Sequence, residues 1–162
     1  MSRTRISLIG EQYDCVKSLF EGTILPDGID HSVTRSPSPE AMRRQLTTWE
    51  FDICEMAFGA YLIARNQGAD VTAIPVIPRR AFFHTNFMVH KDAGIDSPQG
   101  IAGKRIGVAE YVQSAALWAR GVLQHEFGVH AKDMTWWMER NDDKSHGHSS
   151  GFKPPAGESV TP

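Results

Sequence analysis

The chain has 162 residues, of which 41% are hydrophobic, 22% charged and 9% aromatic, and its formal net charge is −2. This composition is too apolar for wholesale disorder, and it offers no basic footprint for nucleic acid. The longest nearly apolar run, residues 56–64, is far shorter than the roughly 20 residues that a membrane-spanning helix needs. We therefore expect a globular fold with no nucleic-acid or membrane partner.

The N-terminus resembles the start of a signal peptide, because arginines precede the apolar run 6–9. Gly10 ends this run well before the 7–15 residues or so of a signal-peptide core are reached. We therefore expect a cytoplasmic location, in which Cys15 and Cys54 are reduced thiols. Two cysteines form neither a disulfide framework nor a zinc spacing.

Apolar spacing and turn residues predict the elements of the first half. We expect strands and helices in alternation: strand 5–10, helix 13–20, strand 31–35, helix 39–49, strand 51–56 and helix 61–66. Ser38 is expected to cap the second helix, with Pro39 at its first position and Glu40 in its first turn. Residues 71–77 are β-branched but contain a proline, which favours an edge strand.

The second half continues the alternation. We expect a β-rich run at 82–90, a short helical turn at 97–103, a strand at 104–110, a helix at 112–127 ended by Gly128, and a strand at 134–138. Strands alternating with helices predict an α/β fold with a largely parallel sheet. Residues 141–162 are rich in Ser, Gly and Pro and poor in apolar residues, so we expect a flexible tail.

Several stretches match a family pattern in order along the chain: 13–14, 51–56, 61–62, 73–78, 80–84, 94–98, 103–111, 118–121, 126–129 and Trp136. Together they resemble the 4,5-dihydroxyphthalate decarboxylase family, which shares the two-lobed fold of type 2 periplasmic solute-binding proteins. Members are about twice this length. The resemblance implies an α/β fold of two lobes with mostly parallel sheets, truncated in the second lobe.

The resemblance also implies a division of the chain. Residues 1–81 correspond to lobe one without its return segment, 82–91 to a strand crossing between the lobes, 92–140 to a partial lobe two, and 141–162 to the flexible tail. It further implies non-oxidative decarboxylation of a hydroxylated aromatic dicarboxylate to protocatechuate in a cleft between the lobes, with no cofactor. The alternative is a transporter-type solute-binding module that clamps a small organic anion without changing it.

Decarboxylation of a hydroxylated ring requires a general acid near the ring face. His84 is one candidate because of its near-neutral pKa, although a hydrogen-bonded strand histidine is the simpler interpretation. Glu55 follows an apolar strand and is either a desolvated acid or a capping carboxylate at the next helix. Glu110 lies between a strand and the long helix, where ligands of open α/β sheets bind.

Carboxylate groups of the substrate need cationic donors, and its ring needs a flat wall. Arg80 is the first carboxylate candidate because its planar fork suits a carboxylate, although most lone arginines are solvated or structurally paired. The remaining candidates for substrate binding are Tyr13, Tyr61, Thr85, Tyr111, Ser114 and Trp118. For the aromatic residues among them, packing in the core is the competing interpretation.

Two further motifs carry less weight. His146 and His148 do not form a ligand set, so no metal site is expected. Residues 103–107 lack the spacing of a phosphate loop. The partner expected is a small aromatic or organic anion, and the sequence leaves a homo-oligomer open. The site hypothesis requires the segments around Glu55, Arg80 and Glu110 to converge on one crevice.

Overall fold

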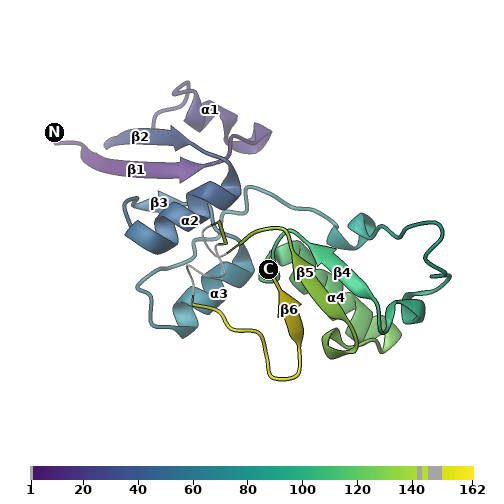
Figure 1. The fold of residues 1–162 in the computed structure, drawn as a ribbon. Coiled ribbons are helices and arrows are strands. Elements are labelled where there is room, and N and C mark those ends of the chain that lie inside the picture. The colour runs from purple at the N-terminus through teal and green to yellow at the C-terminus, as the bar shows by residue number, and fades with distance from the viewer. Residues whose placement is uncertain (1, 142–143, 146–150) are drawn as a thin grey trace. The chain divides into compact units, whose positions relative to one another are not determined.

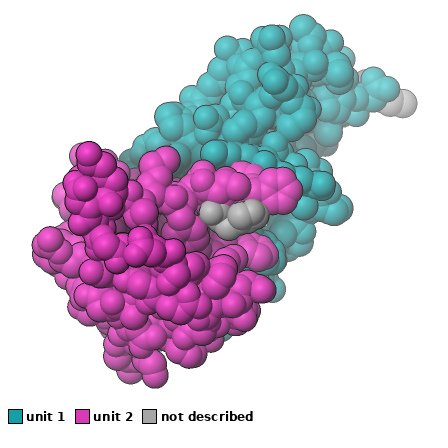
Figure 2. Space-filling view, turned by 90° about the vertical axis from the view of Figure 1, so that its right-hand side faces the viewer, with its two compact units in different colours: residues 1–80 teal, residues 81–162 magenta. Residues whose placement is uncertain are grey.

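The computed structural model describes residues 2–141, 144–145 and 151–162, with the side chain of His84 left out. His146 and His148 lie outside the described residues. The chain divides into two compact units, residues 1–80 and 81–162 (Figure 2). No helix in the described ranges combines the length and apolar character needed to cross a membrane.

Unit 1 is built on a parallel three-stranded sheet in the order β2-β1-β3 (Figure 1). Its strands are β1 (Thr4–Gly10), β2 (Ile29–Arg35) and β3 (Ile53–Cys54). Ile6 of β1 lies opposite His31 of β2, and Leu8 lies opposite Ile53 of β3. Because all three strands run the same way, their carboxyl ends meet at one edge of the sheet.

The helices of unit 1 follow the strands in the chain. They are the 3₁₀ turn η1 (Asp14–Val16) and the helices α1 (Lys17–Phe20), α2 (Ser38–Thr48) and α3 (Phe58–Asn66). α2 ends where Trp49 adopts a left-handed conformation with φ 53°. Leu46 of α2 packs against Ala60 and Ala64 of α3 in a small buried cluster.

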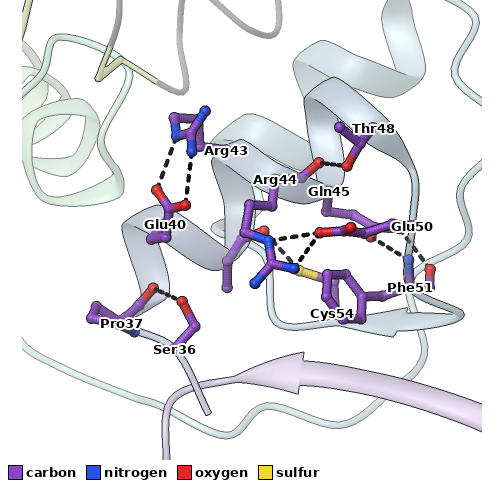
Figure 3. A network of polar contacts seen from close by, with 11 residues as sticks. Ser36, Pro37, Glu40, Arg43, Arg44, Gln45, Thr48, Glu50, Phe51 and Cys54 are labelled. Atoms are coloured by element: carbon purple, nitrogen blue, oxygen red, sulfur yellow. Dashed lines mark hydrogen bonds and ion pairs between the residues drawn. The ribbon is translucent and has the colours of Figure 1, made fainter. Parts of the chain in front are cut away.

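Side chains of α2 fix the chain that leads into β3, as Figure 3 shows. The Gln45 amide donates to the carbonyl of Phe51 at 2.9 Å and accepts from the Phe51 amide at 3.2 Å. The Arg44 guanidinium donates to Glu50 at 2.6 Å (Figure 3). These contacts set the position from which β3, and the residue after it, extend.

Unit 2 contains a second parallel sheet in the order β4-β5-β6 (Figure 1). Its strands are β4 (Arg105–Val108), β5 (Thr135–Met138) and β6 (Ser159–Thr161). The long helix α4 (Ser114–Phe127) ends at Gly128, whose φ of 69° suits glycine. The described part of the unit also contains the 3₁₀ turns η2 (Phe83–Asn86), η3 (Pro98–Ile101) and η4 (Ala131–Asp133).

Trp136 lies at the centre of the core of unit 2 with no exposed surface. Its indole N–H donates to the carbonyl of Ala131 at 2.9 Å, so the buried polar atom is satisfied. Leu123 of α4 and Met134 are buried in the same cluster, and Val160 of β6 packs against it.

The predicted α/β fold with parallel sheets is confirmed. α2 begins one residue before its predicted start, α3 three residues before it, and α4 two residues after it. The strand predicted at 51–56 is reduced to the two residues of β3. The edge strand predicted at 71–77 is wrong, because no element forms there. Ser38 does not cap α2 but is its first residue.

Two of the predicted segments require correction. Residues 82–91 do not form a crossing strand, because they contain the 3₁₀ turn η2. The predicted flexible tail is wrong for its described residues, since β6 pairs in parallel with β5, with Val160 opposite Trp136. A short strand with one apolar side chain gains its stability from the sheet beside it, which local composition does not reveal.

Candidate functional site

Polar side chains gather at the carboxyl ends of the unit 1 strands. Glu11 and Tyr13 follow β1, Ser38 begins the helix after β2, and Glu55 comes directly after β3. Ligands of open parallel sheets bind at this edge. The topology therefore places Tyr13 and Glu55, both predicted from the sequence, in one cluster.

The Glu55 carboxylate is the centre of this cluster. Its Oε1 accepts from the Tyr13 hydroxyl at 2.7 Å and from the Ser38 hydroxyl at 3.1 Å. Its Oε2 accepts from the Glu11 backbone N–H at 3.1 Å. Three donors from three segments hold the half-buried carboxylate in a fixed orientation. The Tyr13 hydroxyl also lies 3.2 Å from Oε2 of Glu11.

Gly10 makes room for this arrangement. A Cβ atom built on Gly10 would lie 3.3 Å from Cβ of Glu55 and 3.5 Å from the Phe20 ring. Burial, reinforced by the hydrogen bond to Glu55, raises the pKa of Tyr13 well above its ordinary value near 10. Tyr13 therefore remains a protonated donor at neutral pH.

Arg80 lies at the end of unit 1 with an exposed side chain, and within the described part of the chain it has no hydrogen bond or ion pair. The Cys15 thiol contacts the carbonyl of Pro78 at 3.1 Å, which ties the segment before Arg80 to the loop after β1. Tyr61, on α3, stacks on the exposed ring of Phe58 with ring centroids 6.1 Å apart. Both predicted residues are thus placed in unit 1.

Glu110 lies at the carboxyl end of β4 in unit 2 and is 1% exposed. The Ser145 hydroxyl donates to its Oε1 at 2.5 Å, and the Arg140 guanidinium lies 3.3 Å from its Oε2. In this conformation the carboxylate is held by the chain after β5 and is closed to solvent.

Tyr111 is also buried, and its hydroxyl donates to the Glu158 carboxylate. The Arg120 guanidinium lies 3.7 Å from the centroid of the Tyr111 ring and donates to the Tyr111 carbonyl at 2.8 Å. Burial, followed by the hydrogen bond to Glu158, raises the pKa of Tyr111.

The remaining predicted residues lie around α4 and η2. Ser114 is the first residue of α4, and Trp118 one turn on is 62% exposed, so it is not part of a core. Thr85 in η2 is exposed and donates through Oγ1 to the Phe82 carbonyl at 2.7 Å. The side chain of His84 lies outside what the structure describes.

Sequence reasoning missed four contributors to these clusters: Glu11, Ser38, Ser145 and Glu158. The first two could have been found from their places just after β1 and at the start of α2. The last two lie in the segment predicted to be a flexible tail, and no local signal marks them. Arg120 is fixed over the Tyr111 ring.

The structure thus joins Tyr13 with Glu55 in unit 1. In unit 2, Glu110 and Tyr111 are neighbours in the chain, and their side chains have separate partners. The expected crevice shared by Glu55, Arg80 and Glu110 stays a prediction. A shallow depression of about 360 Å³ lies over the amino halves of β1 and β2, and none of the predicted residues lines it. Across the described ranges, no three His, Cys, Asp or Glu residues cluster as metal ligands would.

Residues 21–150 match the family model described as "ABC transporter, phosphonate, periplasmic substrate-binding protein". The chain belongs to this family. The chain is also 35% identical over 161 residues to a 4,5-dihydroxyphthalate decarboxylase of Comamonas testosteroni, covering 99% of the chain and 49% of the relative. It is 34% identical over 137 residues to the enzyme of the same name from Pseudomonas putida, covering 84% and 53%.

These matches confirm the resemblance to the decarboxylases that the sequence motifs indicated. The chain spans about half the length of the curated relatives it matches. The periplasmic substrate-binding family accounts for the α/β architecture with parallel sheets.

Proposed function

We propose that this chain takes part in the non-oxidative decarboxylation of 4,5-dihydroxyphthalate, or of a closely similar hydroxylated aromatic dicarboxylate, to protocatechuate. The observation that carries the proposal is the identity of 35% to a decarboxylase of that name over 99% of the chain. The second relative, with the same name, supports the same substrate class.

The reaction needs no oxidant. A general acid adds a proton to the ring carbon that bears the leaving carboxylate, and the electron pair of the breaking C–C bond returns to the ring as CO₂ departs. The para hydroxyl stabilises the protonated ring by releasing electrons. The protein must therefore bind one carboxylate, hold the ring flat and present a proton.

We assign these roles to the predicted residues. Arg80 binds a carboxylate, which its exposure and lack of a described partner support. Tyr61 and Trp118 offer aromatic faces to the ring, and Trp118 is exposed enough to do so. Tyr13, Thr85, Tyr111 and Ser114 are the hydroxyl donors.

Three residues are candidates for the proton donor. Glu55 has the advantage of lying at the carboxyl edge of the sheet, but its carboxylate accepts three hydrogen bonds and would have to take up a proton before it could donate one. His84 retains its candidacy from the sequence. Glu110 would have to leave its contacts with Ser145 and Arg140 before it could reach a substrate.

A second candidate function is binding of a small organic anion without chemistry. The match of residues 21–150 to a family of transporter substrate-binding proteins favours it. The cytoplasmic location and a homo-oligomeric state stay predictions.

The test is incubation of the purified chain with 4,5-dihydroxyphthalate while CO₂ and protocatechuate are quantified. Equal release of both products supports the decarboxylase. Tight binding with the diacid recovered unchanged would favour the binding module. A Glu55→Gln variant serves as the internal comparison, since loss of turnover with retained binding would assign the proton to Glu55.

A further inference from the structure

The strongest feature that the proposed function leaves unexplained is the carboxylate of Glu158 in unit 2. Glu158 directly precedes β6 and accepts a hydrogen bond from the Tyr111 hydroxyl, 47 residues away in the chain. The Arg120 guanidinium lies over the face of the Tyr111 ring, 3.7 Å from its centroid. A carboxylate is thus held by a hydroxyl donor beside a cation.

Arg120 is incompletely neutralised in this arrangement. Burial lowers the pKa of Arg120, whereas the charges of Tyr111 and Glu158 act to raise it. Among the residues that the structure describes, no carboxylate lies within ion-pair distance (4.0 Å) of Arg120. A half-buried cation without a close counter-ion favours the binding of an anion beside it.

The segment that carries Glu158 covers the Tyr111 ring. Phe152 stacks on this ring with centroids 6.2 Å apart, and β6 joins the sheet only through three residues paired with β5. Tyr111 is 2% exposed as a result. We name residues 151–161 the strap, because Phe152 and Glu158 of this segment both contact the Tyr111 side chain.

We propose that the Tyr111 hydroxyl and the Arg120 guanidinium form a subsite for the carboxylate of an aromatic acid, and that Glu158 occupies this subsite while the strap is closed. The occupant already present indicates the chemistry, since a carboxylate accepts a hydrogen bond from the neutral Tyr111 hydroxyl while a cation lies over the same ring. The Trp136 ring, at 5.5 Å from the Tyr111 ring, provides an apolar neighbour for the aromatic part of the ligand. The choice of an aromatic acid rests on the proposed function.

The first test measures binding of phthalate by isothermal titration calorimetry. Glu158→Gln removes the competing charge and should raise the affinity for phthalate by about tenfold. Glu126→Gln, an exposed glutamate on α4, makes the same charge change away from the subsite and should leave the affinity unchanged. Equal affinities in wild type and Glu158→Gln would overturn the proposal.

The second test shows where the ligand binds. In the Glu158→Gln background, Tyr111→Phe should abolish the tenfold gain, because the hydroxyl donor is lost. A gain that persists in the double variant would contradict the assignment. Phenylphosphonate, titrated in parallel, should bind more weakly than phthalate, and the reverse order would overturn the assignment to carboxylates.

A measurement on the wild-type chain avoids any folding defect of the variants. Saturating phthalate should speed hydrogen exchange of the β6 amides that donate to β5, because the strap must leave its place when Glu158 is displaced. Unchanged protection of these amides would overturn the proposal. Since the readouts are binding and exchange, failure of CO₂ release would remove the proposed function and leave this inference standing.

Discussion

Glu55 illustrates how single residues define the site in unit 1. Its carboxylate accepts hydrogen bonds from the Tyr13 hydroxyl, the Ser38 hydroxyl and the backbone N–H of Glu11. Arg80, by contrast, has an exposed side chain without a described partner. Glu55 is therefore held in place by its neighbours, whereas the Arg80 side chain is available to a ligand.

Arg80→Ala should weaken the affinity for an aromatic diacid by about 1.5–3 kcal/mol, because a hydrogen bond between charged groups would be lost. Arg3→Ala, which removes the same charge just before β1, is the matched control and should have no effect. Calorimetric titration of both variants provides the comparison. Unchanged affinity in Arg80→Ala would remove Arg80 from the site.

Tyr13 predicts a dependence of stability on alkaline pH. Its pKa is raised in the folded chain, so the unfolded state loses the phenolic proton first as pH rises past about 10. The stability contributed by Tyr13 is therefore complete below that pH and declines above it. Tyr13→Phe should lower the free energy of unfolding by about 1 kcal/mol at pH 7 and flatten the alkaline decline.

Urea denaturation between pH 7 and 11 measures both effects. Tyr61→Phe is the control, since the Tyr61 hydroxyl has no hydrogen bond within the described part of the chain. A decline in Tyr13→Phe as steep as in wild type would refute the assignment.

At the scale of elements, the two sheets depend on few large side chains. β5 contributes two neighbouring tryptophans with opposite environments, Trp136 at 0% exposed and Trp137 at 44%. Because side chains alternate along a strand, one points into the core and the other away from it. The pair offers a matched test of how the core of unit 2 is stabilised.

Trp136→Ala should lower the free energy of unfolding by about 3–5 kcal/mol, because a large cavity remains and the Ala131 carbonyl loses the indole donor. Trp137→Ala should change it by less than about 1 kcal/mol. Chemical denaturation followed by circular dichroism gives both values. Similar losses in the two variants would show that the orientation of β5 is wrong.

For the whole molecule, the two units have separate cores, one around Leu46 and Ala60 and one around Trp136. Each core is closed by contacts within its own unit. We therefore expect the units to lose structure in separate steps.

Ile9, fully buried in β1, provides the test. Ile9→Ala should destabilise unit 1 by about 2–5 kcal/mol, while amides of β4 and β5 keep their protection from hydrogen exchange. Ile24→Ala is the control, because Ile24 is 62% exposed in the same unit. Equal loss of protection in both units would show that they unfold as one.

Strong local signals made much of the fold predictable. The apolar spacing before Gly128 predicted α4, and the turn residues around Pro39 predicted α2, since both patterns act within one helix. The strand at 82–91 and the edge strand at 71–77 were wrong, because β-branched residues form strands only where another strand pairs with them. The candidate site followed from motifs in part, and Glu11 and Ser38 were missed.

The amino-acid sequence by itself determined the α/β class, the main helices and the resemblance to the decarboxylases, because these depend on local periodicity and on motifs. Only the tertiary structure decided that Tyr13 and Ser38 hold Glu55, and that Glu158 holds Tyr111. These contacts join residues 17 to 47 positions apart in the chain. Such pairings arise from the order of the strands and the packing of the strap, which no local pattern encodes.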